Sequence, residues 1–325
     1  MNKKNLKRLS ISMAVLTVTS AYSQVSEYPS RPITAVVNSA AGSSTDTGMR
    51  LVAQKLGERL KQAVVVDNKV GASGAIGAEY VAKAAPDGYT LLTTVNTLAI
   101  MPAVRNDLPF DVLKDFTYIT KLLNVSLTFG LSNNVPAKDL KELFALIRAN
   151  PGKYTFSSPG VGSPHHLAGE LIKQNLKLDI VHVPHKDLAL AVQNVVGGHV
   201  DMIVSGTGSV LALGNTGKMK LLATSGTKRA SYAPNIPTFN ELGYSFMDDV
   251  DGWTALAGPA KMPPAVVARL SRELREVLAL PEVRDGSTKI GVEAVWSSPE
   301  QTDAFIRTDV ARWQQVVSQG KVKPQ

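Results

Sequence analysis

A strand-like run, Ile33-Thr34-Ala35-Val36-Val37, leads into the loop Asn38-Ser39-Ala40-Ala41-Gly42-Ser43-Ser44-Thr45-Asp46, and an apolar-periodic helix follows. Halfway along the chain the same order returns. The residues Tyr154 to Ser157 lead into Ser158-Pro159-Gly160-Val161-Gly162-Ser163-Pro164-His165-His166, and a second helix follows. A strand, a small-residue loop and a helix therefore recur in two comparable halves of the chain.

Both loops end where a helix begins, and such a position favours anions. The first N–H groups of a helix have no partner inside it, and the helix dipole attracts negative charge to the same point. Two such loops in one chain predict a cleft that holds a small carboxylate from both sides.

The first residues have the pattern of a secretory signal peptide. Four basic residues between positions 3 and 8 precede a short apolar run, Leu9 to Val18, and the small-residue exit Ala21-Tyr22-Ser23. A membrane-spanning helix needs about 20 apolar residues, and this run is shorter and contains Ser and Thr. We expect cleavage after Ser23, export through the inner membrane and a periplasmic mature protein.

Composition argues against several classes of protein. The formal net charge of +8 falls to +4 without the basic residues of the signal peptide, and the remaining charges are scattered, so a nucleic-acid partner is not expected. The absence of cysteine excludes disulfides and thiolate metal sites. The 44% hydrophobic content and the lack of a second long apolar run predict a soluble, monomeric mature protein with a conventional core.

Strand and helix signals alternate along the chain, which predicts an α/β fold with two mainly parallel sheets. The expected strands are Ile33 to Val37, Val64 to Asp67, Thr90 to Thr94, Phe116 to Leu122, Leu127 to Leu131, Thr155 to Ser157, Ile180 to Val183, Met202 to Val204, Leu221 to Thr224 and Thr254 to Ala257. The expected helices are Asp46 to Lys61, Ala75 to Ala84, Asp139 to Asn150, Pro164 to Asn175, Ala189 to Val196, Ser209 to Leu213, Pro264 to Leu280 and Pro299 to Gln319.

The repeated plan predicts two lobes. We assign residues 24–124 plus 250–325 to lobe one and residues 125–249 to lobe two, after a signal peptide at residues 1–23. The chain then crosses twice between the lobes, and two crossings beside a cleft form a hinge of the kind that closes on a ligand.

The first loop offers hydroxyls beside free N–H groups. Ser39, Ser43, Ser44 and Thr45 suit a carboxylate, and Asp46 suits an early helix position because its charge complements the helix dipole. Asp46 is equally explained as a plain helix cap. The two roles are compatible, since a cap that fixes the helix start also fixes its N–H groups.

The second loop places Gly160 and Gly162 where backbone must approach a ligand, and Ser163 and Pro164 follow at a helix start. The adjacent histidines of this loop point about 100° apart on a helix, so they do not share a metal easily, and one buried and one surface histidine is the simpler explanation. Ser158 and His166 complete the candidate residues of this loop.

Further candidates follow two other predicted strands. Asn96 and Thr97 come after one strand, and His185 and Asp187 come after another. The carboxyl ends of parallel strands meet at one edge of a sheet, so these residues are expected at the cleft unless they belong to ordinary surface loops.

Enzymatic motifs are lacking. The run Gly71-Ala72-Ser73-Gly74-Ala75-Ile76-Gly77 has the wrong spacing for a dinucleotide-binding turn, and we interpret it as a third loop lining the cleft. No nucleophile elbow, zinc-protease motif or phosphate-binding loop occurs. We expect no catalytic residues, cofactor or metal; an exported hydrolase using Asp46 and His166 is the alternative from another class.

Several motifs together resemble the periplasmic solute receptors of tripartite tricarboxylate transporters, the Bug-type receptors, and the similarity covers nearly the whole mature chain. The motifs are Tyr28-Pro29-Ser30-Arg31-Pro32-Ile33, Gly42-Ser43-Ser44-Thr45-Asp46, Asp67-Asn68-Lys69 before Gly71-Ala72-Ser73-Gly74, Ala84-Ala85-Pro86-Asp87-Gly88-Tyr89-Thr90-Leu91, His166-Leu167-Ala168-Gly169-Glu170 and Val181-His182-Val183-Pro184.

The resemblance implies a two-lobed, hinged periplasmic binding protein fold that holds a small organic anion between the two loops, largely through backbone N–H groups and bridging water. The gripping positions that carry over are Ser39, Ser43, Thr45, Asp46, Ser158, Gly160, Gly162 and Ser163. The implied partners are the permease subunits of a tripartite tricarboxylate transporter, or alternatively a sensor kinase.

The chain departs from the family's pattern where the ligand is selected. An aromatic residue and prolines of the family are replaced by Asn38-Ser39-Ala40-Ala41, a Tyr and a Gly by His185 and Asp187, and an Asp-Asn pair by Ser205-Gly206. We hypothesise that Asp187 favours a ligand with a cationic or hydroxyl group beside its carboxylate. Unchanged ligand preference in an Asp187→Ala variant would reject this hypothesis.

Overall fold

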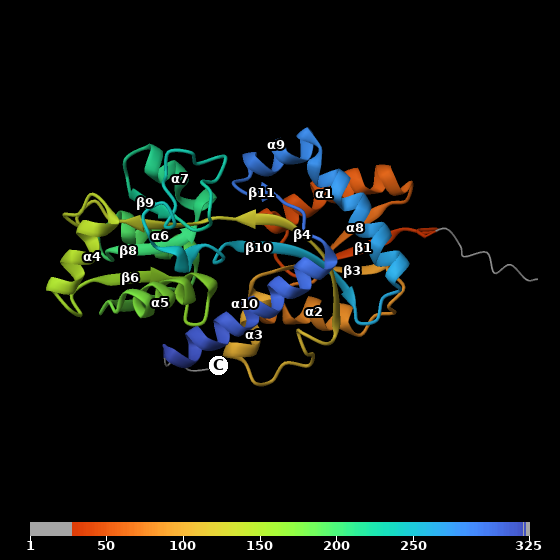
Figure 1. The fold of residues 1–325 in the computed structure, drawn as a ribbon, viewed down its shortest axis with the longest axis horizontal. Coiled ribbons are helices and arrows are strands. Elements are labelled where there is room, and N and C mark those ends of the chain that lie inside the picture. The colour runs from red at the N-terminus through yellow and green to blue at the C-terminus, as the bar shows by residue number, and fades with distance from the viewer. Residues whose placement is uncertain (1–27, 321, 323–325) are drawn as a thin grey trace, which may run out of the picture.

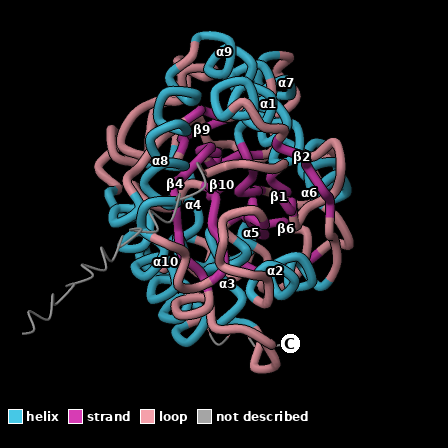
Figure 2. The backbone as a smooth tube through the Cα atoms, turned by 90° about the vertical axis from the view of Figure 1, so that its right-hand side faces the viewer, coloured by secondary structure: helices cyan, strands magenta, loops and turns pink. Residues whose placement is uncertain are grey.

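The computed structural model describes residues 28–320 and 322. The predicted signal peptide, residues 1–23, lies outside the described residues. Figure 1 shows two groups of elements side by side, each with a sheet covered by helices, and Figure 2 shows the strands enclosed by helices when the molecule is turned by 90°.

The first group is built on a six-stranded sheet in the order β11-β4-β10-β3-β1-β2. Strand β1, next to the edge strand β2, runs parallel to β2 and β3, whereas β10 runs antiparallel to β3 and β4, and β11 antiparallel to β4. The strands are β1 (Ile33–Val37), β2 (Val64–Asn68), β3 (Thr90–Val95), β4 (Phe116–Val125), β10 (Gly252–Pro259) and β11 (Glu293–Ala294). The helices are α1 (Ser44–Leu60), α2 (Ala75–Ala82), α3 (Thr97–Val104), α8 (Pro264–Ala279), α9 (Pro281–Lys289) and α10 (Pro299–Gln319), with the 3-10 turn η1 (Ala72–Gly74).

The second group is built on a five-stranded sheet in the order β7-β6-β8-β5-β9. Here β6 runs parallel to β7 and β8, whereas β5 is antiparallel to β8 and β9. The strands are β5 (Leu127–Leu131), β6 (Thr155–Ser158), β7 (Val181–Pro184), β8 (Met202–Gly206) and β9 (Lys220–Thr224). The helices are α4 (Leu140–Ala149), α5 (Pro164–Leu176), α6 (Leu188–Val196) and α7 (Thr207–Asn215), with the 3-10 turn η2 (Ser245–Met247). The predicted α/β fold with two sheets is confirmed, and both sheets are mixed around a parallel centre.

The apolar run of β1 explains why helices cover both faces of its sheet. Ile33, Ala35 and Val37 belong to one buried cluster with α1 and α8, whereas Val36 belongs to the other, which includes side chains of α2, α3 and α10. A strand buried on both faces has no polar alternation, because neither face meets water. The run Ile33-Thr34-Ala35-Val36-Val37 is of this kind.

The chain passes between the sheets twice. It leaves β4 and enters β5 at Ser126, and it returns between β9 and β10. The Asp251 carboxylate joins the two passages, since it accepts hydrogen bonds from the Asn124 side-chain amide and the Ser225 hydroxyl. The Ser225 hydroxyl oxygen also accepts the Leu127 N–H at 2.7 Å.

The last helix, α10, contacts both groups. It begins at a capping box in which Ser298 and Gln301 each bond the other's backbone N–H, and it packs along α3 and β4. The Trp253 indole N–H donates to Asp309 of this helix at 2.8 Å. Toward its end the Val316 carbonyl accepts a hydrogen bond of 2.9 Å from Gln174 on α5. The C-terminal helix is thereby tied to the six-stranded sheet and to a helix of the five-stranded one.

Two helices were not expected from the sequence, α3 and α9. The segment of α3, Thr97-Leu98-Ala99-Ile100-Met101-Pro102-Ala103-Val104, is almost wholly apolar and has a proline inside it. An all-round apolar pattern gives no amphipathic signal, and an interior proline argues against a helix. The helix forms because burial of Leu98, Ala99, Ile100 and Met101 outweighs the missing hydrogen bond.

Candidate functional site

The first loop is held by Asp46 and Ser43. The Ser43 hydroxyl caps α1 by accepting the Asp46 N–H at 3.2 Å, and the Asp46 carboxylate reaches back to accept the Gly42 N–H at 2.8 Å. Ser39 joins this arrangement through its hydroxyl, 3.1 Å from that of Ser43. The residue that caps the helix is therefore Ser43 and not Asp46, which is the third helical residue and holds the loop through its carboxylate.

The Asp46 carboxylate is also paired with groups outside its loop. It accepts hydrogen bonds from Arg50 Nε at 3.1 Å and from Asn68 Nδ2 at 2.9 Å, and its side chain is buried. Burial raises the pKa of a carboxyl, but the bonds from Arg50, Gly42 and Asn68 outweigh burial and hold the pKa of Asp46 below its usual range. Asp46 is an ionised group that fixes the loop.

Two helix-start N–H groups remain free in this loop. The amides of Ser44 and Thr45, the first two residues of α1, have no acceptor within the described part of the chain. Ser44 is exposed to solvent, whereas Thr45 is buried. Free amides beside exposed small residues are the feature that suits an anion.

The second loop repeats this hydrogen bonding with a different residue. The Ser163 hydroxyl caps α5 by accepting the His166 N–H at 3.2 Å, and His166 Nδ1 reaches back to accept the Gly162 N–H at 3.1 Å. The Ser163 hydroxyl donates to the Gly160 carbonyl at 2.8 Å. Because Nδ1 accepts, the ring proton of His166 is on Nε2.

A second, half-buried histidine, His182, supports this loop from β7. The ring of His182 stacks on that of His166 with 3.9 Å between centroids, and its Nε2 lies 2.7 Å from the Ser158 hydroxyl. Burial lowers the pKa of His166 to about 4, with a smaller contribution from Lys173. Burial, followed by the neighbouring His166, lowers the pKa of His182 to about 3. The second loop is therefore held in place by two neutral imidazole rings, those of His166 and His182.

A cavity of about 420 Å³ lies between the second loop and the six-stranded group. Its walls come from the loop Pro159 to Pro164, from one side of α3 and from Ser73 of η1. The structure thus brings Thr97 together with Gly160, Gly162 and Ser163, as predicted for a cleft. No residue of the first loop belongs to the walls of this cavity.

Thr97 contributes an unsatisfied hydroxyl to this cavity. Its Oγ1 is inaccessible to solvent and has no hydrogen-bond partner among the residues that the structure describes. A buried hydroxyl without a partner costs free energy, so a rotation of the Thr97 side chain toward an acceptor in the cavity would be favourable. The neighbouring Asn96 is buried and begins α3, where its carbonyl accepts the Ala99 and Ile100 N–H groups.

The other predicted residues have local partners. Asn38 is buried against the glycine turn and donates to the Gly74 carbonyl at 3.3 Å and to Thr94 Oγ1 at 3.0 Å. Asp187 is exposed and caps α6 by accepting the Leu190 N–H at 2.8 Å. His185 follows β7 beside the second loop, where its backbone N–H donates to the Ser158 carbonyl at 2.8 Å.

The sequence analysis missed four residues of α3 and its end that line the cavity: Ile100, Met101, Val104 and Arg105. It also missed His182. The spacing of Thr97, Ile100, Met101, Val104 and Arg105 places all of them on one helix face, and this was the available signal. His182 gave no signal beyond its place in a strand, because stacking depends on the fold.

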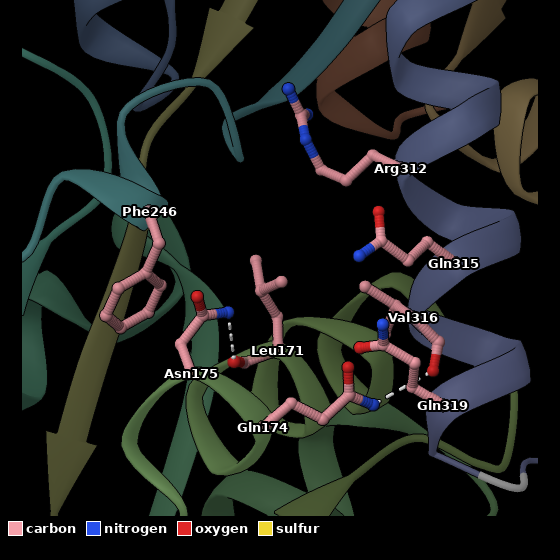
Figure 3. A pocket seen from close by; sticks show the side chains of 8 residues that line it. All are labelled: Leu171, Gln174, Asn175, Phe246, Arg312, Gln315, Val316 and Gln319. Atoms are coloured by element: carbon pink, nitrogen blue, oxygen red, sulfur yellow. Dashed lines mark hydrogen bonds between the residues drawn. The ribbon is translucent and has the colours of Figure 1, made fainter.

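A smaller cavity of about 280 Å³ lies between α5 and α10 (Figure 3). Amide side chains from both helices line it, and the Gln174 bond to Val316 crosses its edge, as Figure 3 shows. Among residues 28–320, no cluster of three or more His, Asp or Glu side chains has the geometry of a metal site. No helix within the same range is long and apolar enough to span a membrane.

Comparison with known proteins matches residues 49–321 to the tripartite tricarboxylate transporter family receptor. The solved structure of the periplasmic binding protein BugD is 30% identical, covers 92% of this chain and 100% of its own, and has a TM-score of 0.72. A Rhodopseudomonas palustris protein solved with adipate is 27% identical over 92% of this chain and 100% of its own, with a TM-score of 0.75. MatC from the same organism, solved with bound malate, is 29% identical over 89% and 100%, with a TM-score of 0.70.

Proposed function

This chain belongs to the tripartite tricarboxylate transporter receptor family of periplasmic solute-binding proteins, and from this premise we propose that it captures a small organic carboxylate in the cavity between α3 and the second loop. The family is one of binding proteins, so no catalytic step is assigned. The predicted site residues around both loops are proposed as the groups that form or support this cleft.

The unpaired hydroxyl of Thr97 carries the proposal. Thr97 lines the cavity opposite the second loop, and a rotation of its side chain on ligand binding would let a carboxylate oxygen supply the missing partner. Serine, threonine and backbone N–H groups are typical carboxylate ligands in binding proteins that use no metal. The relatives solved with adipate and with malate support an organic acid as the ligand class.

Closure of two lobes would bury the ligand. We assign residues 24–124 plus 250–325 to one lobe and 125–249 to the other, with the hinge at the two passages near Ser126 and Asp251. The support is that the chain changes sheet at these passages and that the cavity has walls from both groups. Removal of water on closure would strengthen each polar contact with the anion.

Delivery to a membrane permease is the proposed role of the captured ligand. Family membership supports permease subunits of a tripartite tricarboxylate transporter as the partner, and a sensor kinase remains the second candidate. The proposed signal peptide, residues 1–23, would bring the protein to the periplasm where both partners are reached.

Thermal melting with a panel of mono-, di- and tricarboxylates tests the proposal. A ligand at 100 times its dissociation constant should add about 2.7 kcal/mol to the free energy of unfolding. Thr97→Val keeps the shape of the side chain and removes the hydroxyl, so it should reduce the shift, whereas Thr308→Val on the outer face of α10 serves as the matched control.

Recovery of the compound intact from the protein separates a receptor from an exported hydrolase. A melting temperature that does not change with any carboxylate would reject the proposed function. Equal shifts in wild type and Thr97→Val would reject the assigned position of the anion.

A further inference from the structure

One face of α3 forms the longest wall of the cavity. Thr97, Ile100, Met101, Val104 and Arg105 all line it, at spacings of three and four residues. Over this span the helix rises about 12 Å, at 1.5 Å per residue. The wall is therefore long enough to contact a small ligand along its whole length.

The chemistry changes along this wall. Thr97 supplies a hydroxyl at the helix start, where the helix dipole also favours negative charge. Ile100, Met101 and Val104 make the middle apolar. Arg105 stands at the far end and is the only charged side chain among the described residues that line the cavity. The order is polar, apolar and cationic.

Arg105 keeps donors for a further partner. Its Nε and Nη2 donate to the Asp107 carboxylate at 2.9 and 3.0 Å, and Nη1 makes a long contact of 3.4 Å with the Ala72 carbonyl. A guanidinium has five N–H groups, so these contacts leave some uncommitted. The Arg105 side chain is 24% exposed against 71% for Asp107, and Arg105 lines the cavity whereas Asp107 does not.

We propose that Arg105 is a specificity-determining residue that binds a second anionic group of the ligand, so that the preferred ligand is an elongated organic acid with an apolar middle and an anionic group at each end. This inference rests on the proposed function. An apolar acid with one carboxylate would leave the uncommitted donors of Arg105 without an acceptor when water is removed. A short hydroxy acid would place its polar groups against the apolar middle of the wall.

Calorimetric titration of the exported, purified protein with adipate and hexanoate tests the inference. The two compounds have the same carbon chain and differ in the second carboxylate. We expect adipate to bind at least tenfold more tightly than hexanoate. This factor is typical of one charge-assisted hydrogen bond that adipate makes and hexanoate lacks. Arg105→Gln should bring adipate to the affinity of hexanoate and leave hexanoate unchanged.

Asp107→Asn probes the same cation from its other side. Removing the exposed carboxylate that competes for Arg105 should tighten adipate severalfold at low salt and leave hexanoate unchanged. Arg307→Gln is the matched control, because Arg307 makes the same two-pronged pair with Asp303 on the surface of α10 at 2.7 and 3.3 Å. It should change neither affinity.

Each other result overturns the inference. Equal affinity of wild type for adipate and hexanoate, or tighter binding of malate than of adipate, would reject the role of Arg105 and leave the proposed function standing. An equal loss of affinity for adipate and for hexanoate in Arg105→Gln would show that Arg105 has a structural role only. Failure of every carboxylate to bind would reject the proposed function itself, and the inference with it.

Discussion

The loops before α1 and α5 share one capping pattern, but one carries a negative charge and the other is neutral. In each, a serine caps the helix, and the third helical residue reaches back to the N–H of the glycine before the cap. The acceptor is an ionised carboxylate at Asp46 and a neutral imidazole at His166. The comparison teaches that the loop's shape and its charge are controlled separately.

The surroundings of each acceptor set its charge. Asp46 is paired with Arg50 and Asn68, which stabilise the anion. The ring of His166 stacks on that of His182 and lies near that of Phe156, and these surroundings disfavour a cation. The neutral loop is the one that lines the cavity. An incoming carboxylate therefore meets no fixed negative charge in the second loop.

The largest expected effect comes from giving the second loop the residue of the first. His166→Asp would bury a carboxylate beside Phe156 and His182, where the nearest cation, Lys173, already pairs with Glu170 at 2.7 Å. We expect a loss of about 3 kcal/mol in the free energy of unfolding. Urea denaturation measures it; a loss below that of His166→Gln would show that the carboxylate finds a partner there.

Asp46→Asn should have the next largest effect, about 2 kcal/mol, because it removes the charge that accepts from Gly42, Arg50 and Asn68. The same denaturation experiment applies. Ser44→Ala, two residues before Asp46 at an exposed position, should hardly change the free energy of unfolding. An effect of Asp46→Asn no larger than this control would contradict the assigned role of the carboxylate.

Acid should weaken the second loop before the first. His166 has a pKa of about 4 in the folded protein, below the ordinary 6.5, so the unfolded chain takes up the proton first and stability falls as pH drops from about 6.5 toward 4. Burial also lowers the pKa of His182 on β7 to about 3 and that of His165 to about 4, so both act in the same direction as His166. Near His166, the Lys173 cation opposes protonation of the imidazole and the Glu170 carboxylate favours it.

Between pH 7 and pH 5 we expect His166 to account for a loss of about 1–2 kcal/mol. Melting temperature against pH measures the loss, and His166→Gln should flatten the curve in this window. Asp46 acts only at lower pH, since its pKa lies below the usual carboxyl range and its stabilisation is lost as pH falls through that value. A curve unchanged by His166→Gln would place the titration elsewhere.

The smallest expected losses of stability come from the serine caps, which both loops share. Ser43→Ala and Ser163→Ala each remove one cap hydroxyl, and each should cost about 1 kcal/mol. Near-equal losses would support the equivalence of the two helix starts. Each hydroxyl also has a second partner, Ser39 for Ser43 at 3.1 Å and the Gly160 carbonyl for Ser163 at 2.8 Å, so clearly unequal losses would contradict the equivalence.

The sequence predicted the features that depend on neighbouring residues. The strand, loop and helix order, Ser163 at the second helix start and the glycines of the second loop follow from local pattern, because capping acts over three or four residues. At the first helix the sequence indicated Asp46 as the cap, whereas the cap is Ser43. The cavity wall of α3 could not be predicted in this way. Its helix is stable only when packed under α10, and the alignment of Arg105 with Gly160 and Ser163 depends on elements far apart in the chain.

His182 and Asp187 illustrate both sides of this limit. Asp187 precedes a helix and caps it, as an aspartate in that position commonly does, so local chemistry already explains it. His182 supports the second loop by stacking on His166 from another strand. Nothing in the residues around His182 indicates this contact, because the register of β6 and β7 creates it.

The bond from Gln174 to the Val316 carbonyl makes the angle between the two sheets observable in solution. Gln174 is on α5, and Val316 is on the helix anchored to the other sheet through Trp253 and Asp309. A rotation of one sheet against the other would change the distance from Gln174 Nε2 to the Val316 carbonyl oxygen. The NMR resonance of the Gln174 side-chain amide would therefore report the rotation. Neither Gln174 nor Val316 lines the cavity beside α3, so a ligand bound there would not contact them directly.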